Sequence, residues 1–196
     1  MIKVAVIEGG YSKEKAVSLK SAQTVFENLN RKKYFPTKVL IGEKEWTAYD
    51  NEGKYTIDKN DFSFTKNGTK NTFDVAFIVI HGSPGEDGKL QGYFDLIGLP
   101  YTTPSQMITA LTFEKFHCNQ FLKNFGLNVA EAVLIKKADT INSSSIVEQV
   151  GLPCFVKPTD GGSSFGISKV TEEKELKSAI ELAFRHGSQV IIEEFI

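Results

Sequence analysis

The sequence predicts an α/β protein, in which a doubly wound parallel-sheet domain precedes a smaller α+β subdomain. A β-branched run at residues 2–7 is followed by two glycines and then by helical periodicity, which is how doubly wound domains open. A second block of α and β segments fills the C-terminal part of the chain. We expect the boundary near Pro104, with the α/β domain at 1–104 and the α+β subdomain at 105–196.

The first domain's elements follow from its apolar pattern. Residues 2–7 predict a buried strand, and residues 14–30 predict a helix whose apolar side chains recur every three or four positions. Residues 36–41 predict a second strand. Residues 42–73 are polar and rich in turn signals, which predicts small hairpins at a sheet edge. The near-continuous apolar run at 74–80 predicts a central parallel strand buried on both faces.

The later elements follow from capping and periodicity. A short helix at 90–97 and a strand at 101–103 complete the first domain. Thr112 is the expected N-cap of a helix that reaches Phe125, with Gly126 as its left-handed C-terminal residue. The second domain then contains strands at 130–135, 153–157, 166–170 and 189–195, a helix at 144–150, and a helix that runs from a Thr171 cap to Gly187.

Composition and charge exclude several classes of protein. The 196 residues carry 23 basic and 24 acidic side chains and a net charge of −1, so we expect no nucleic-acid partner. Cys118 and Cys154 form no CxxC pair, which argues against a local zinc site and a disulfide scaffold. No apolar run is long enough to span a membrane and no signal peptide is evident, so we expect a cytoplasmic protein without a membrane partner.

Two loops in the first domain carry chemistry-bearing residues. Residues 9–14, GGYSKE, lie where ligands bind in open α/β sheets. Glu14 either complements the dipole of the next helix or holds a cationic ligand group such as an ammonium. Residues 81–88, HGSPGEDG, form a glycine-rich loop. His81 there has a binding role or a structural one, and Asp87 either joins the site or caps the next helix.

Two lysines in the second domain are candidate phosphate ligands. Lys115 lies in the first turn of its helix, where a cation opposes the dipole, and falls on the expected inward face with Cys118, Phe121, Leu122 and Phe125. Its partner is either a phosphate or, if its head snorkels, water. Lys157 ends an apolar strand before a glycine–serine loop, whose backbone amides can approach a phosphate. The loop is not a Walker A motif, and a plain surface hairpin is the alternative.

Together these motifs resemble the D-alanine–D-alanine ligases of the ATP-grasp superfamily. The resemblance is carried by residues 9–14, 17–19, 81–82, 85–88, 90–92, 98–102, 115, 152–153, 155–158, 162–166 and 192–193. Members of that family use ATP to join two D-alanines through an acyl phosphate for peptidoglycan synthesis. The resemblance implies a ligase with D-alanine and ATP as substrates, a Mg²⁺ or Mn²⁺ cofactor, and a homodimer formed through the first domain. It also implies that residues 1–104 form a substrate-binding domain and that residues 105–196 form a central ATP-grasp subdomain.

The resemblance also implies roles for individual residues. Glu14, with His81 nearby, would bind the ammonium of the first D-alanine. Ser163 would help bind the carboxylate of the second and tie its loop to Glu14, which makes Glu14 and Ser163 the implied catalytic residues. The implied contacts with ATP are those of Lys115 and Lys157 to phosphates, and those of Glu193, Glu194 and Ile196 to adenine.

Two departures from the family pattern stand out. Glu8 lies where the family usually has an apolar or small residue. Family members also continue well beyond this length, and the Mg²⁺ ligands belong to that part, so no metal ligand is expected here and a polypeptide of these residues alone is expected to be inactive. The alternatives are a D-alanine–D-lactate or D-alanine–D-serine ligase, or a non-catalytic binding or assembly module.

Overall fold

The computed structural model describes residues 1–162 and 165–196. The chain divides into unit 1, Met1–Ala110, and unit 2, Leu111–Ile196. Each unit has a hydrophobic core built from its own residues. None of the helices in the described ranges is both long and apolar enough to cross a membrane.

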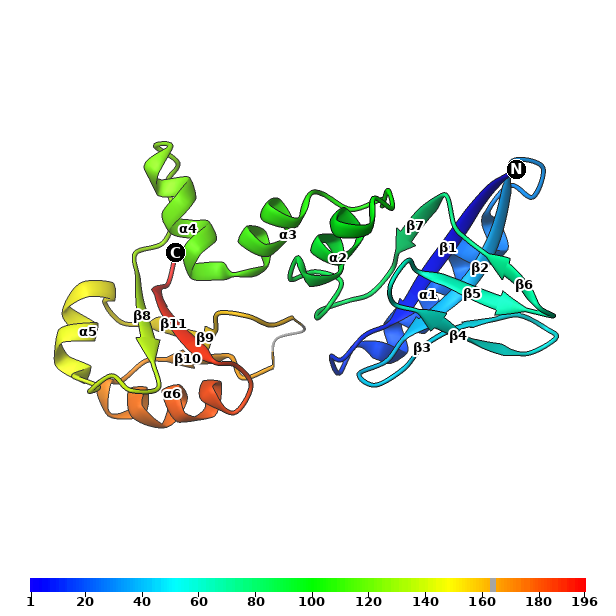
Figure 1. Ribbon diagram of the computed structural model, residues 1–196. Coiled ribbons are helices and arrows are strands. Elements are labelled where there is room, and N and C mark those ends of the chain that lie inside the picture. Colours follow the sequence, from blue (N-terminus) through cyan, green and yellow to red (C-terminus); the bar gives the residue numbers. More distant parts are fainter. Residues whose placement is uncertain (163–164) are drawn as a thin grey trace. The chain divides into compact units, whose positions relative to one another are not determined.

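Unit 1 is built on a seven-stranded sheet in the order β6-β5-β4-β3-β2-β1-β7 (Figure 1). The parallel part consists of β1 (Ile2–Gly9) between β2 (Tyr34–Ile41) and β7 (Val75–Ile78). Beyond β2 the sheet is antiparallel, through β3 (Trp46–Tyr49), β4 (Lys54–Asp58), β5 (Ser63–Lys66) and β6 (Thr69–Asn71). The α/β fold class is confirmed, and so are the hairpins expected in residues 42–73.

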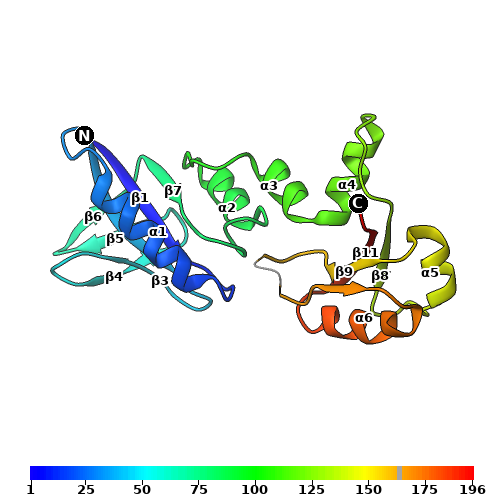
Figure 2. The ribbon, with the colours of Figure 1, turned by 180° about the vertical axis from the view of Figure 1, so that it is seen from behind.

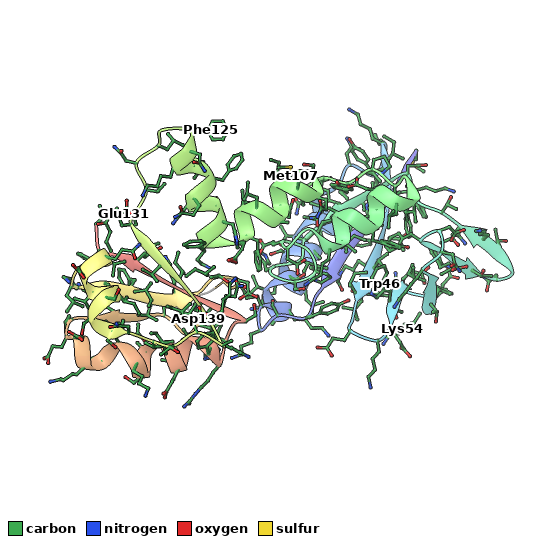
Figure 3. All side chains as sticks on the ribbon, turned by 60° about the vertical axis from the view of Figure 1, so that its left-hand side comes forward. Trp46, Lys54, Met107, Phe125, Glu131 and Asp139 are labelled. Carbon is green, nitrogen blue, oxygen red and sulfur yellow. The ribbon has the colours of Figure 1, made fainter. Side chains whose placement is uncertain are left out.

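Helices cover both faces of this sheet because the side chains of β1 alternate between them. Val4 and Val6 pack against α1 (Lys15–Asn28), which lies along β1 in Figure 2. Ile7, on the other face, shares a core with Phe94 of α2 (Lys89–Ile97). On that face the aromatic rings of the hairpins meet α2, as where the ring of Trp46, labelled in Figure 3, lies 5.1 Å from that of Tyr93.

The strands expected at 74–80 and 101–103 are shorter than the sequence predicts. β7 ends the sheet order, and its outer edge carries one bridge, between Ala76 and Tyr101. Thr102 satisfies two more groups of β7, because its N–H donates to Ala76 O (3.1 Å) and its Oγ1 accepts from Ile78 N–H (3.3 Å). Pro104 has no N–H with which to extend the ladder, so the pairing stops there.

The helix expected from Thr112 to Phe125 is interrupted at Glu114. The residues before the break belong to the end of α3 (Gln106–Phe113), and α4 (Lys115–Asn124) follows it. Thr112 lies inside α3 and is not an N-cap. Glu114 is extended between the helices because its backbone bridges to Asp160, and this pairing replaces a helical turn.

The prediction that Phe121 and Phe125 lie on a buried face of this helix is also wrong. In α4 no residue is buried; Phe121 is 41% exposed, and Phe125, labelled in Figure 3, is 71% exposed. Gly126 has the left-handed conformation expected at the helix end, with φ of 78°.

Unit 2 contains a four-stranded antiparallel sheet in the order β10-β9-β11-β8. Its strands are β8 (Ala132–Lys136), β9 (Cys154–Pro158), β10 (Ser168–Val170) and β11 (Gln189–Glu194). α5 (Ser143–Val150) and α6 (Leu176–Phe184) pack on one face, where Val156 and Ile192 meet Ile146 and Ile180. The antiparallel sheet with helices on one face confirms the α+β subdomain.

The start of α6 differs from the expected Thr171 cap. A short 3₁₀ turn, η1 (Glu173–Glu175), precedes α6, and its capping residue is Glu172. The side chains of Glu172 and Glu175 each accept a hydrogen bond from the other residue's backbone N–H, which is a capping box. Thr171 instead donates its N–H to the Glu175 carboxylate (3.0 Å).

Candidate functional site

In unit 1, hydrogen bonds join the two loops that follow β1 and β7. Ser12 Oγ donates to His81 O (2.7 Å), and Tyr11 N–H donates to Ser83 O (2.9 Å). Ser18, fully buried in α1, donates to Val79 O (2.8 Å) and accepts from Gly9 N–H (3.0 Å). These bonds fix the loop that carries Glu14 against the loop that carries His81.

The close approach of the two loops requires a glycine at position 82. Gly82 has φ of +75°, and a Cβ atom there would lie 2.8 Å from Ser12 Cβ. A larger residue would therefore separate the loops that these hydrogen bonds hold together.

Glu14 and His81 lie on the two joined loops. Glu14 is the N-cap residue of α1, and its side chain makes no capping hydrogen bond to the helix. His81 Nε2 is buried and has no hydrogen-bond partner among the described residues. A buried polar atom left without a partner costs free energy, so a ligand or water that pairs with Nε2 is favoured.

Gln91 is a residue that sequence reasoning missed as part of this site. Its side chain is fully buried, and Nε2 donates to Gly85 O (2.6 Å) and to Thr103 Oγ1 (2.9 Å). The exposed residue Glu86 accepts from Gly82 N–H (2.6 Å), so both side chains hold the glycine-rich loop. A polar residue in an otherwise apolar stretch of α2 was the available signal.

Asp87 takes the structural role that the sequence left open. Its carboxylate accepts from Lys89 N–H (3.3 Å) at the start of α2 and pairs with the Lys89 ammonium (2.6 Å). This side chain is therefore engaged with the helix that follows the loop.

In unit 2, the backbone of the segment 159–161 holds the side chain of Lys115. The ammonium donates to Gly161 O (2.7 Å) and Thr159 O (3.3 Å), and the Lys115 N–H also donates to Thr159 O (3.1 Å). Burial lowers the pKa of Lys115 from its usual range, and the positive charge of Lys157 lowers it further. The head of this lysine is thus held by protein carbonyls next to a second cation.

Lys157 is paired across the sheet with Glu193. Both side chains are largely buried, and they form an ion pair between β9 and β11. They lie on the face opposite α5 and α6, because the neighbours Val156 and Ile192 point into the helix-covered core. The carboxylates of Glu114, Asp160 and Glu193 offset these effects on Lys115 only in part. A polyanionic ligand there would therefore relieve the repulsion between the two lysines.

Glu194 points to the other face and pairs with the start of β8. Its carboxylate accepts from Glu131 N–H (2.9 Å), and its own N–H donates to Glu131 O (3.0 Å). Glu194, Ile196 and Lys123 line an open groove of about 820 Å³. The structure therefore brings Glu194 and Ile196 to one groove and Glu193 to the lysines.

Ser163, the remaining expected site residue, lies outside the described residues. Glu14 and His81 belong to unit 1, whereas Lys115, Lys157, Glu193, Glu194 and Ile196 belong to unit 2. Within residues 1–162 and 165–196, no group of three His, Cys, Asp or Glu side chains is placed to hold a metal ion.

Comparison with protein families gives two matches that cover most of the chain. Residues 3–104 match the model described as the D-ala D-ala ligase N-terminus, and residues 121–196 match the D-ala D-ala ligase C-terminus. The chain is 47% identical over 194 residues to the D-alanine–D-alanine ligase of Parabacteroides distasonis, covering 98% of this chain and 59% of that relative. The ligase of Flavobacterium johnsoniae is also 47% identical, over 100% of this chain and 61% of its own length.

Solved structures agree in fold over the whole chain. The VanG D-Ala:D-Ser ligase from Enterococcus faecalis has a TM-score of 0.85 at 35% identity, with 100% of this chain and 63% of VanG covered. A D-alanine–D-alanine ligase from Coxiella burnetii has a TM-score of 0.89 at 26% identity, with 100% and 64% covered. One from Bacillus anthracis complexed with ATP has a TM-score of 0.78 at 26% identity, with 100% and 60% covered. This chain thus spans about 60% of the length of the curated relatives it matches.

Proposed function

We propose, from the premise that this chain belongs to the D-alanine–D-alanine ligase family, that it forms part of an ATP-dependent ligase that joins two D-alanines through a D-alanyl phosphate. The family membership rests on the two family models, which cover residues 3–104 and 121–196. The observation that carries the proposal is the half-buried Lys115 beside the Lys157–Glu193 pair, because this arrangement suits a polyphosphate. The product would enter peptidoglycan synthesis.

In unit 1 the proposed ligand is the first D-alanine. The Glu14 carboxylate would bind its ammonium by a charge-assisted hydrogen bond. The buried His81 Nε2 gives a second polar group on the adjoining loop, and the Ser12 and Ser18 bonds pre-orient both loops. Such preorganisation lowers the entropy lost when the substrate is bound.

In unit 2 the proposed ligand is ATP. Lys115 and Lys157 would bind its phosphates, and their charges would stabilise the negative charge that moves during phosphoryl transfer. Glu193, Glu194 and Ile196 would form the strand beside the adenine. We also propose that Ser163 contacts the carboxylate of the second D-alanine; this role rests on the sequence resemblance alone.

The described residues do not fit a Mg²⁺ site. Mg²⁺ prefers carboxylate oxygens in near-octahedral geometry, and residues 1–162 and 165–196 offer no cluster of three such ligands. We therefore assign no metal ligand to these residues and derive no step through the ion.

The proposal also covers the domains, the location and the oligomeric state of the protein. We propose a first domain at 1–104, supported by the family match to 3–104, with a central ATP-grasp subdomain after it. Use of ATP as a substrate fits a cytoplasmic location. A homodimer through the first domain is proposed on the sequence resemblance alone.

A second candidate function is the joining of D-alanine to D-serine. The observation that favours it is the 35% identity to the VanG D-Ala:D-Ser ligase over the whole of this chain. This chain covers 63% of VanG.

The test is a product assay on the full-length protein that carries this sequence. With ATP and Mg²⁺, we expect phosphate release that depends on D-alanine, together with D-alanyl-D-alanine identified by mass spectrometry. D-Serine and D-lactate, added in turn at equal concentration, decide between the alternatives by the mass of the product. Absence of any D-alanine-dependent phosphate release from folded protein contradicts the proposal and favours a binding or assembly module.

A further inference from the structure

The turn between α6 and β11, residues 186–188, contacts both ends of the glycine–serine loop. That loop leaves β9 at Pro158 and returns before β10, and its described residues are 159–162 and 165–167. From the sequence pattern, this turn is expected only to end a helix. Its contacts are non-local, and they lie next to the carbonyl groups that hold Lys115.

At the first end of the loop, the turn fits closely against Asp160. A Cβ atom on Gly187 would lie 2.7 Å from Asp160 Oδ1 and 2.7 Å from Pro158 Cβ, so only glycine fits. Ser188 Oγ lies 3.5 Å from Asp160 Oδ2, and Thr159 N–H donates to Gln189 O (3.1 Å). The backbone of the segment 159–161 is thus fixed from the side of the turn.

At the second end, the same turn fits closely against Gly166. A Cβ atom on Gly166 would lie 2.9 Å from His186 Cδ2, and the φ of Gly166 is +73°. The rings of Phe165 and His186 are stacked, with centroids 6.2 Å apart and planes at 24°. Three consecutive residues therefore support both ends of the loop.

The segment 159–161 also carries the carbonyl groups that bind Lys115. Thr159 O and Gly161 O accept from the Lys115 ammonium on one side of the segment, while Gly187 and Ser188 contact Asp160 on the other. A shift of this segment by a fraction of an ångström changes both hydrogen bonds to the ammonium.

We propose that Gly187 and Ser188 are positioning residues, which hold the segment 159–161 in place and thereby fix the ammonium of Lys115 for an ATP phosphate. The proposal rests on the proposed function for its phosphate ligand, but not for the contact between the turn and Lys115. It assigns to this turn a role in nucleotide binding through the loop, without contact between the turn and the nucleotide.

The test uses Gly187→Ala, because the added methyl group pushes Asp160 and Pro158 away. In the 196-residue chain, ¹⁵N NMR of lysine Nζ groups reports the pKa of Lys115 directly. We expect the variant to raise that pKa toward its usual range, because displacement of the segment exposes the ammonium to water. In the full-length enzyme, we expect KM for ATP to rise at least tenfold, with KM for D-alanine unchanged.

Two controls and a second variant keep the test decisive. Arg185→Ala changes an exposed neighbour of the turn, and Gly53→Ala adds a methyl group whose closest contact is 3.5 Å. Both are expected to match the wild type. Ser188→Ala removes the weaker contact, and we expect it to raise KM for ATP about two- to tenfold.

The possible outcomes separate this inference from the proposed function. A folded Gly187→Ala chain with the wild-type Lys115 pKa overturns the inference, even where the enzyme is an active ligase. If Gly187→Ala does not fold, an unchanged Lys115 pKa in Ser188→Ala overturns it instead. A shifted Lys115 pKa in a protein without ligase activity supports the inference and contradicts the proposed function.

Discussion

At the scale of single residues, Glu8 combines deep burial with an incomplete set of hydrogen bonds. The residue is 1% exposed; Oε1 accepts a hydrogen bond from Tyr49 Oη, while Oε2 has no partner among the described residues. Burial raises the pKa of Glu8, and the Tyr49 hydrogen bond and the charge of Lys38 offset only part of this effect. Ionised Glu8 therefore destabilises the fold, because a buried charge is costly.

Replacement of Glu8 by glutamine should make the stability of unit 1 less dependent on pH. A carboxyl group whose pKa is raised in the folded state contributes stability below its usual value of 4.5, and this contribution is lost as the pH rises through the raised pKa. We expect the Tm of Glu8→Gln to rise relative to that of the wild type as the pH increases from 4.5 to 8, measured by calorimetry. The exposed control Glu43→Gln should follow the wild type, and parallel curves for Glu8→Gln and the wild type would show that Glu8 does not titrate in this range.

Glu14 is the residue that we propose to bind the ammonium of the first D-alanine. In the full-length protein, we expect Glu14→Gln to raise KM for D-alanine and to leave KM for ATP nearly unchanged. Loss of one charge-assisted hydrogen bond is worth about 1.5–3 kcal/mol, or roughly 10- to 150-fold. Steady-state kinetics with each substrate varied in turn measures the two constants, and a change confined to KM for ATP would show that Glu14 does not bind D-alanine.

At the scale of elements, sequence patterns predict the helices and strands that depend on interactions between residues close in the chain. The β-branched run of β1 and the periodic face of α1 appear where the sequence places them, because each depends on neighbours within a few positions. The break between α3 and α4 was not predictable, because the backbone of Glu114 pairs with Asp160, which is distant in sequence. Tertiary pairing overrides helix propensity there.

The same distinction between local and long-range interactions applies to the candidate site. Its loops and residue types were predictable, since glycines, lysines and acids stand out against apolar strands. Their partners were not: the carbonyls that hold Lys115 and the pairing of Lys157 with Glu193 both need the sheet to be assembled. Glu8 was noted as unusual, but its burial depends on Tyr49, which comes from the neighbouring hairpin.

The N-terminus of α5 gives a test of one element in isolation. Asn142 Oδ1 accepts a hydrogen bond from Ser145 N–H (3.2 Å), which satisfies one of the free N–H groups of the helix. Asn142→Ala should cost about 1 kcal/mol and lower the Tm of unit 2 by about 4–8 °C. Asn142→Asp keeps the acceptor oxygen, so its Tm should stay close to that of the wild type. An equal loss of Tm in both variants would show that this hydrogen bond does not stabilise the helix.

At the scale of the whole molecule, stability is divided between cores that share no residues. The core with Phe94 belongs to unit 1, and the core with Ile180 belongs to unit 2. Both side chains are fully buried, so their replacement by alanine removes apolar contacts and leaves a cavity within one unit.

Paired core substitutions should therefore destabilise one unit at a time. We expect Phe94→Ala to cost about 3–5 kcal/mol and Ile180→Ala about 2–5 kcal/mol, each by loss of packing in its own core. Hydrogen–deuterium exchange, read peptide by peptide, measures where protection is lost. Phe94→Ala should speed exchange in β1 and α2 and leave β9 and α6 at the wild-type rate, and Ile180→Ala should do the reverse. Loss of protection across both units from either substitution would mean that the units unfold together, because cooperative unfolding carries the cost of one cavity to every amide.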